Sequence, residues 1–168
     1  ECQSASQQIL YLLDRDLCRA DRRVCRAQKK DGRLRAYLFR RGKKIMNKSD
    51  FNKIEQYMLS CMGDSAHDSQ HIYRVLFIAL DIAEHEKNVD KDILIAACLL
   101  HDIGRKEQFE DPSLCHAQVG AEKARTFLLE NGFDSEFADR AAACVRKHRY
   151  RSASPPEKIE EKILFDSD

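Results

Sequence analysis

Histidine and aspartate side chains with the chemistry of metal ligands gather in one part of the sequence. All six His lie between residues 67 and 148, and the pair His101-Asp102 closes the most apolar stretch of the chain, Ile93 to Ile103. Neighbouring residues of a helix point about 100° apart, so both side chains can flank one ion beyond the end of that helix. Imidazole and carboxylate together suit a borderline divalent cation such as Mn²⁺, Fe²⁺, Co²⁺ or Zn²⁺. A capping Asp beside a hydrogen-bonded His is the structural alternative for such a pair.

Further His and Asp residues could complete this site. His71 lies near the start of an earlier apolar pattern, and Asp166 and Asp168 follow a later apolar run. Two His and two Asp from three helices would hold one cation and leave coordination positions open to water. Open positions are what a catalytic cation needs, because bound water then loses a proton near neutral pH and becomes a nucleophile.

Helices are the elements that must position these side chains. Apolar residues recur every three or four positions over 8–28, 51–62, 68–87, 90–103 and 112–131, and again from 135 and from 157. Asp90 is the predicted N-cap of one of these helices and Asp134 or Ser135 that of another, and Gly104 is the predicted left-handed C-cap of a third. No segment alternates apolar and polar residues over five positions. The predicted class is therefore all-α, a compact multi-helix bundle.

The charge distribution divides the chain near residue 45. Residues 1–45 hold 13 Lys and Arg against five Asp and Glu, although the whole chain of 168 residues has a net charge of only +1. We therefore expect a basic N-terminal helix or arm over 1–45 and a domain over 46–168. A coding start at Met46 would make the first 45 residues a non-native leader, whereas a native arm would suit nucleic acid. Because the chain stops inside a helical pattern, we expect the domain to be incomplete at its C-terminal end.

Cysteine usage and hydropathy favour a cytoplasmic protein. The seven Cys include no Cys-x-x-Cys pair, and most sit in apolar helical stretches, as small buried residues do in a reducing compartment. No apolar run approaches the roughly 18–20 residues of a membrane helix, and the first residues show no signal-peptide pattern. We expect a monomer or homodimer without a membrane partner.

The order of these residues over 64–168 resembles the HD superfamily of metal-dependent phosphohydrolases, in particular its small stand-alone bacterial members. The resembling segments are His67-Asp68-Ser-Gln-His71-Ile-Tyr-Arg74, Leu-Leu-His101-Asp102-Ile-Gly-Arg105, His116-Ala-Gln-Val-Gly120, Val-Arg-Lys-His148-Arg149 and Asp166-Ser-Asp168. The resemblance implies an HD-type helical bundle.

The resemblance also implies a role for each matching position. The expected ligands of the first cation are His71, His101, Asp102 and Asp168. Asp166 stays open as an alternative to Asp168, because Ser167 stands where the family usually has Ala. The two remaining matching histidines would bind a second cation or line the substrate pocket; they are His116 and His148.

The implied function is hydrolysis of a phosphate ester of a nucleotide or related small molecule, by a phosphomonoesterase or phosphodiesterase with metal-bound water as nucleophile. Mn²⁺ is the first choice because the ligand set is rich in oxygen, and Fe²⁺, Co²⁺, Ni²⁺, Zn²⁺ and Mg²⁺ stay open. His101 and Asp102 would be catalytic, and Arg105 and Arg149 would bind phosphate through their forked donors. The alternatives are a non-catalytic nucleotide-binding regulatory module and a (p)ppGpp-type pyrophosphohydrolase. Nucleic acid would be a partner only through the basic arm.

Overall fold

The structure, a computed structural model, describes residues 46–62, 66–149 and 154–168, without the side chains of 66–68. The described residues from Ser49 to Asp168 belong to one compact unit. The helix predicted over 8–28 and the basic arm lie outside the described residues, as do the side chains of His67 and Asp68.

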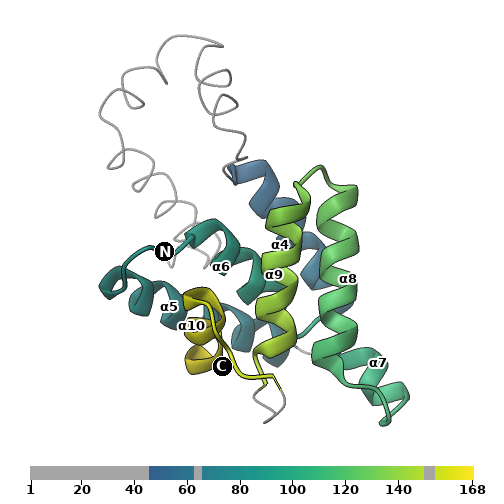
Figure 1. Cartoon of the computed structure of the whole chain (residues 1–168). Helices are drawn as coiled ribbons and strands as arrows, with labels where there is room; N and C mark the ends of the chain where they lie inside the picture. The colour runs from purple at the N-terminus through teal and green to yellow at the C-terminus, as the bar shows by residue number, and fades with distance from the viewer. Residues whose placement is uncertain (1–45, 63–65, 150–153) are drawn as a thin grey trace. The chain divides into compact units, whose positions relative to one another are not determined.

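The described residues form helices and contain no strand (Figure 1). In chain order they are α4 (Lys48–Cys61), α5 (Ala66–His85), α6 (Lys91–Leu100), α7 (Arg105–Glu110), α8 (His116–Glu130), α9 (Ser135–Lys147) and α10 (Ile159–Ser167). The predicted all-α class is confirmed.

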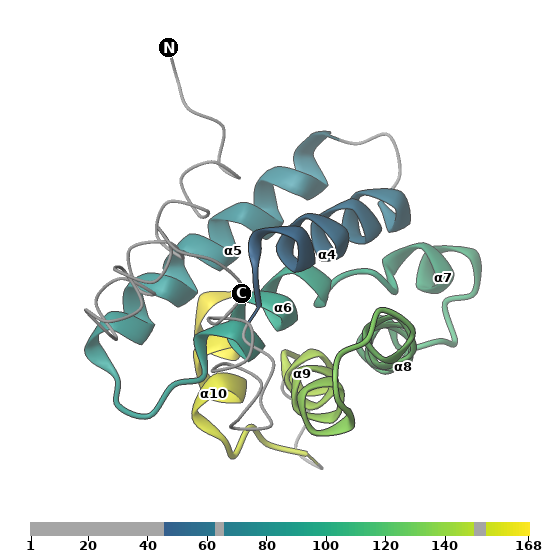
Figure 2. The same ribbon diagram turned by 90° about the horizontal axis from the view of Figure 1, so that it is seen from above.

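Helix α6 is the centre of the bundle because it is apolar on all sides. Every residue from Ile93 to Leu100 is buried. The helix packs against α5, α8, α9 and α10, and Figure 2 shows it enclosed by its neighbours. The predicted cap Asp90 begins it, with its side chain accepting a hydrogen bond from the Ile93 N–H. Its C-terminal end therefore carries His101 and Asp102 into the interior of the bundle.

Helices α8 and α9 form the most extensive helix pair among the described residues. The turn between them contains Gly132, whose φ of 80° favours glycine, and Asp134, one of the two predicted caps, accepts from the Phe137 N–H at 2.8 Å. This pair matters for the site because α8 begins at one candidate histidine, His116, and another, His148, is the C-cap of α9.

Gly104 is needed for a different reason from the one predicted. Its φ is −96°, so the left-handed cap is wrong, and α7 follows directly. A Cβ on Gly104 would lie 2.7 Å from the backbone N of Gly120 in α8, and closer still to the carbonyl oxygen of His116. Gly104 therefore allows the end of α6 to approach the backbone of α8.

Helix α7 lies where the periodicity predicts no helix. It has six residues, and its one apolar side chain, Phe109, is 90% exposed. Contacts with α8 hold it instead, among them an ion pair between Glu107 and Lys123 at 2.5 Å. The next helix begins at His116 rather than at the predicted residue 112, because a turn in which Asp111 accepts from Ser113 separates the two helices.

Helix α10 is held in the bundle by two buried acidic residues. Glu160 accepts from Arg140 at 3.0 Å and Glu161 accepts from Lys147 at 2.9 Å. Burial raises the pKa of Glu161, but a backbone N–H and the Lys147 ammonium outweigh it and lower the pKa. Paired in this way, the Glu161 carboxylate stays charged inside the protein. The two acidic residues fix α10 and with it Asp168, the C-cap of that helix.

Among the described helices, none combines the length and the apolar character that crossing a membrane would require.

Candidate metal centre

Four of the predicted ligands meet at one point. His71 comes from α5, His101 and Asp102 from the end of α6, and Asp168 from the end of α10. The Nε2 atoms of His71 and His101 are 3.3 Å apart, and Asp168 Oδ1 lies 3.1 and 3.6 Å from them. Asp102 Oδ2 lies 3.6 and 3.4 Å from the same two atoms. Asp166 is exposed and is not one of the side chains that meet there.

These spacings fit ligands around one cation. Metal–ligand bonds of about 2.0–2.2 Å place neighbouring ligand atoms roughly 3–3.5 Å apart. We name His71, His101, Asp168 and Asp102 Oδ2 the first cluster.

The second cluster consists of His116, His148 and the other oxygen of Asp102. The two Nε2 atoms are 3.3 Å apart, and Asp102 Oδ1 lies 3.6 Å from His116 Nε2 and 3.8 Å from His148 Nε2. The Asp102 carboxylate thus lies between two pairs of histidines and turns one oxygen toward each pair. A carboxylate in this position can bridge two cations.

Backbone hydrogen bonds set which ring nitrogen of two histidines carries a proton. His101 Nδ1 lies 2.7 Å from the Cys98 carbonyl oxygen, and His148 Nδ1 lies 2.6 Å from that of Val145. A carbonyl only accepts, so Nδ1 is the donor in both rings. In the neutral ring Nε2 is then left with a free lone pair aimed into its cluster, as in metal-binding histidines.

Gln108 sets which ring nitrogen of His116 carries the proton, and nothing in the sequence pattern indicates this role. Its amide nitrogen donates to the Leu114 carbonyl at 3.0 Å, which fixes the amide orientation. Its Oε1 then lies 2.6 Å from His116 Nδ1 and accepts from it. The Nε2 lone pair of His116 consequently faces Asp102. A single Gln in a short polar helix has no spacing that could reveal this in advance.

The second cluster consists of hydrogen-bond acceptors alone. Asp102 Oδ1 is buried and has no hydrogen-bond partner. The two imidazole nitrogens beside it present lone pairs. A buried carboxylate oxygen without a donor is strongly unfavourable, and a cation is the partner that all three atoms accept. The residues present therefore fit a metal ion.

Electrostatics in the first cluster favour a positive charge at its centre. Burial lowers the pKa of His101, but hydrogen bonds with Asp102 and Asp168 outweigh it and raise the pKa to about 9. Burial raises the pKa of Asp102, yet His101 and Arg105 hold it well below its usual range. The hydrogen bond with His101 also lowers the pKa of Asp168. Both carboxylates are therefore negatively charged at neutral pH.

The histidines of the second cluster are neutral. Burial and the nearby His101 charge lower the pKa of His148 to about 4. Burial also lowers the pKa of His116. Neutral imidazole is the form that binds a metal ion.

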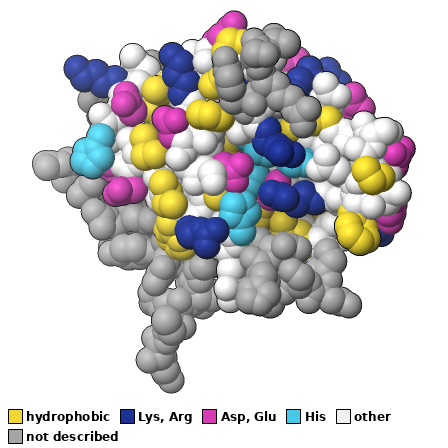
Figure 3. All heavy atoms as spheres, turned by 90° about the horizontal axis from the view of Figure 1, so that it is seen from below, with side chains coloured by type: hydrophobic (Ala, Val, Ile, Leu, Met, Phe, Trp, Pro, Cys, Tyr) yellow, Lys and Arg dark blue, Asp and Glu magenta, His cyan; other side chains and the backbone are white. Residues whose placement is uncertain are grey.

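Arginine side chains surround the two clusters. Arg105 Nε is 2.6 Å from Asp102 Oδ2, Arg149 Nη1 is 3.4 Å from His116 Nδ1, and Arg74 Nη2 is 3.1 Å from His71 Nδ1. All three side chains are exposed. Figure 3 shows basic, acidic and histidine side chains gathered together on one face of the molecule. Positive groups at the edge of a metal centre suit an anionic ligand.

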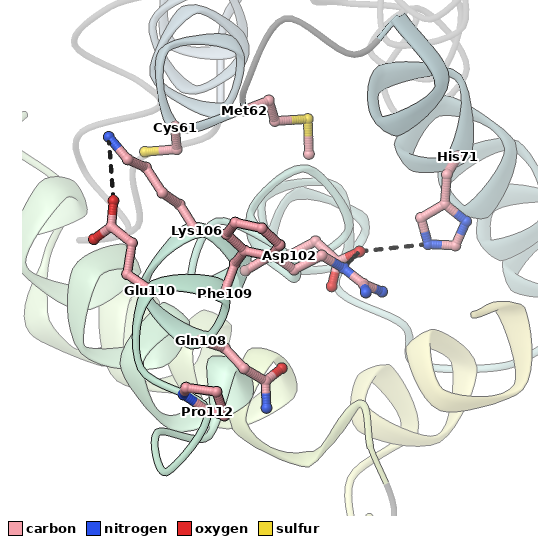
Figure 4. Close-up of a pocket in the computed structure, with 10 residues that line it drawn as sticks. Cys61, Met62, His71, Asp102, Lys106, Gln108, Phe109, Glu110 and Pro112 are labelled. Atoms are coloured by element: carbon pink, nitrogen blue, oxygen red, sulfur yellow. Dashed lines mark ion pairs between the residues drawn. The ribbon is translucent and has the colours of Figure 1, made fainter.

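A cavity of about 1030 Å³ opens in front of the first cluster. His71, Asp102 and Arg105 form the part of its wall next to the cluster, while Lys106 and Phe109 of α7 and Met62 lie farther out (Figure 4). The cavity is large enough for a ligand the size of a nucleotide.

Fold and site together define a helical domain whose His and Asp side chains are arranged so that they can hold a metal ion. Residues 68–168 match the HD domain family, and the chain belongs to that family.

Three relatives illustrate the similarity. A crystal structure of a predicted HD superfamily hydrolase from an uncultured Thermotogales bacterium is 31% identical, with a TM-score of 0.59 over 69% of this chain and 64% of the other. A tRNA (cytidine(56)-2'-O)-methyltransferase of Thermoplasma volcanium is 33% identical over 70% of this chain. An uncharacterized protein of Acanthamoeba polyphaga mimivirus is 29% identical over 57% of it. The chain spans only 31% and 43% of the lengths of these last two proteins.

Proposed function

We propose that this protein is a divalent-metal-dependent phosphohydrolase that cleaves a phosphate ester of a nucleotide or a related small molecule. The observation that carries the proposal is the Asp102 carboxylate, which turns one oxygen to each of two histidine pairs. Membership of the HD family and the hydrolase title of the Thermotogales structure support it. We also propose that residues 46–168 form the domain and that 1–45 form a separate basic arm.

The residues that would hold a first cation are His71, His101, Asp102 and Asp168. When bound, a divalent cation at this point polarises a phosphoryl oxygen and lowers the pKa of water. Mn²⁺ is the preferred ion because half of the donors are carboxylate oxygens. The chain keeps Nε2 of His101 directed at the site through the Cys98 carbonyl.

His71 must change its hydrogen bonding to become a ligand. Arg74 donates to its Nδ1, so in the neutral ring Nε2 carries the proton and donates to Asp168. Arg74 is exposed and is free to turn outward. His71 Nδ1 then takes the proton, and its Nε2 lone pair faces the other ligands.

The second cluster is better suited to a second cation than to a substrate phosphate. A phosphate oxygen needs donors, but His116 and His148 present lone pairs and Asp102 Oδ1 is negative. Phosphate placed there would face three acceptors. We therefore propose that His116, His148 and Asp102 hold a second ion, with Gln108 orienting His116.

Arg105 and Arg149 are the proposed phosphate-binding groups. Both are exposed at the edge of the clusters, and guanidinium groups bind phosphate oxygens through two parallel N–H donors. Arg105 already lies on Asp102, so it can hold a phosphoryl oxygen beside the first cluster and stabilise the charge that develops during hydrolysis.

The test is hydrolysis of a chromogenic phosphate ester by the metal-loaded chain. We expect Mn²⁺-dependent phosphate release that stops on chelation and returns when Mn²⁺ is added back. His101→Ala should abolish the activity, whereas His85→Ala, an exposed histidine on α5 outside both clusters, should retain it. Tight metal binding without turnover of this ester or of any nucleoside mono-, di- or triphosphate would instead favour the regulatory module.

A further inference from the structure

The cavity in front of the first cluster has an outer wall whose chemistry the metal centre does not explain. Short helix α7 forms much of it. Glu107 and Gln108 on this helix bond to Lys123 and His116 and so hold the helix against α8. Phe109 makes no such attachment and lines the cavity.

Phe109 is an unusual residue to leave in water. It is 90% exposed, far more than any other large hydrophobic residue in the described part of the chain. Burial of an aromatic ring is ordinarily a main source of stability, so this ring contributes almost nothing to folding. An exposed apolar group that lines a cavity beside a reactive site is better explained by ligand binding.

Cationic residues share the face of α7 that carries this ring. Arg105 precedes Phe109 by four positions and Lys106 by three, so all three residues project from one side of the helix. The backbone of Phe109 therefore lies about one helical turn, roughly 5.4 Å, beyond that of Arg105. Lys106 and Phe109 both line the cavity, with the Lys106 ammonium 4.0 Å from Glu110 Oε1, and Met62 lines another side of it (Figure 4). A nucleotide has the same order of groups: phosphate, a short sugar spacer, then a flat ring.

We propose that this face of α7 is the nucleoside subsite of the protein, in which Phe109 stacks on the base and Lys106 holds the phosphate chain. This inference rests on the proposed function and narrows it to esters that carry an aromatic base. A sugar phosphate would meet the same cations but would leave the ring of Phe109 in water. Stacking on one exposed ring tolerates any base, because each base has a π face.

The experiment compares two ligands that differ only in the base. They are the phosphonate analogues of AMP and of ribose 5-phosphate, in which a methylene group replaces the ester oxygen so that neither is hydrolysed. Binding to the Mn²⁺-loaded full chain is measured by calorimetry. We expect the AMP analogue to bind about tenfold more tightly than the ribose analogue, and Phe109→Ala to remove this difference without weakening the ribose analogue.

Matched variants separate the contributions. Phe109→Tyr should keep the preference for the AMP analogue, Lys106→Ala should weaken both ligands, and Ile78→Ala, an exposed apolar residue outside the cavity, should change neither. Equal binding of the two analogues, or an equal loss of both in Phe109→Ala, would overturn the subsite even if AMP is hydrolysed. A base preference that depends on Phe109 would uphold the subsite even if the protein hydrolyses no ester.

Discussion

Replacing Gly104 with Ala should disrupt the contact between α6 and α8. The new Cβ would lie 2.7 Å from the Gly120 backbone N, whereas ordinary contacts begin at 3.4 Å, so the two backbones must separate by at least about 0.7 Å. Because the obstacles are backbone atoms, no side chain can rotate to make room. Overpacking of a core costs about 1–3 kcal/mol, and we expect Gly104→Ala to lie near the upper end. For a domain of this size that corresponds to a loss of about 10 °C in Tm.

Gly120→Ala is the matched control for this contact. Its Cβ would lie 3.4–3.5 Å from its nearest neighbours, which is ordinary contact. Ala is also about 1 kcal/mol better than Gly inside a helix, so Gly120→Ala should be as stable as the wild type or more stable. The two substitutions thus have opposite expected effects, although the two glycines face each other.

Circular dichroism during urea and thermal unfolding measures both variants, since the chain has no Trp. Metal content gives a second readout, because the clash at the His116 carbonyl should push His116 away from Asp102 and weaken the second cluster. A Gly104→Ala protein as stable as the wild type, or a Gly120→Ala protein equally destabilised, would refute the close approach described here.

The remaining predictions concern the two clusters and α10. Gln108→Ala should weaken the affinity of the second cluster for its cation about 10–100-fold, because His116 loses the partner that fixes its proton on Nδ1. Competition with a chromogenic chelator measures this affinity, and an unchanged value would contradict the role of Gln108. Asp102→Asn should weaken the binding of both cations together. Weaker binding of only one cation in the same titration would argue against a carboxylate shared by the two clusters. Glu161→Gln should lower the free energy of unfolding by about 2 kcal/mol at pH 7, because Lys147 loses a charged partner. The lowered pKa of Glu161 means that this stabilisation is present above the usual Glu pKa of about 4.3 and disappears as the pH falls through the folded value, so the unfolding curves of the two proteins should differ at pH 7 and converge in acid.

Local signals predicted most of the helices. The cap Asp90 and the stop at Gly132 follow from backbone chemistry within a few residues, and both are found. Of the two predicted caps Asp134 and Ser135, the structure uses Asp134. Helix α7 escaped prediction because contacts with α8 hold it rather than an apolar stripe of its own. The left-handed cap predicted at Gly104 is wrong, because Gly104 is needed for the close approach of two helices. The residues next to Gly104 in the sequence do not indicate such an approach.

The candidate site was predictable only as a set of residue types. The order of His and Asp residues indicated His71, His101 and Asp102, the resemblance to the HD superfamily favoured Asp168 over Asp166, and the structure brings these four side chains together. The sequence did not show that Asp102 faces both histidine pairs, because that depends on how α6, α8 and α9 pack. Gln108 and Phe109 were missed for the same reason: their surroundings are created by the fold.

The most direct test of the two clusters is the metal content of the chain. Protein saturated with Mn²⁺ and then freed of unbound ion is analysed for manganese, as wild type and as His101→Ala, His148→Ala and His85→Ala. We expect two ions per chain in the wild type and in His85→Ala, and one fewer in each of the other two variants. A wild type that retains no ion, or a His101→Ala protein that retains as much as the wild type, would contradict the account.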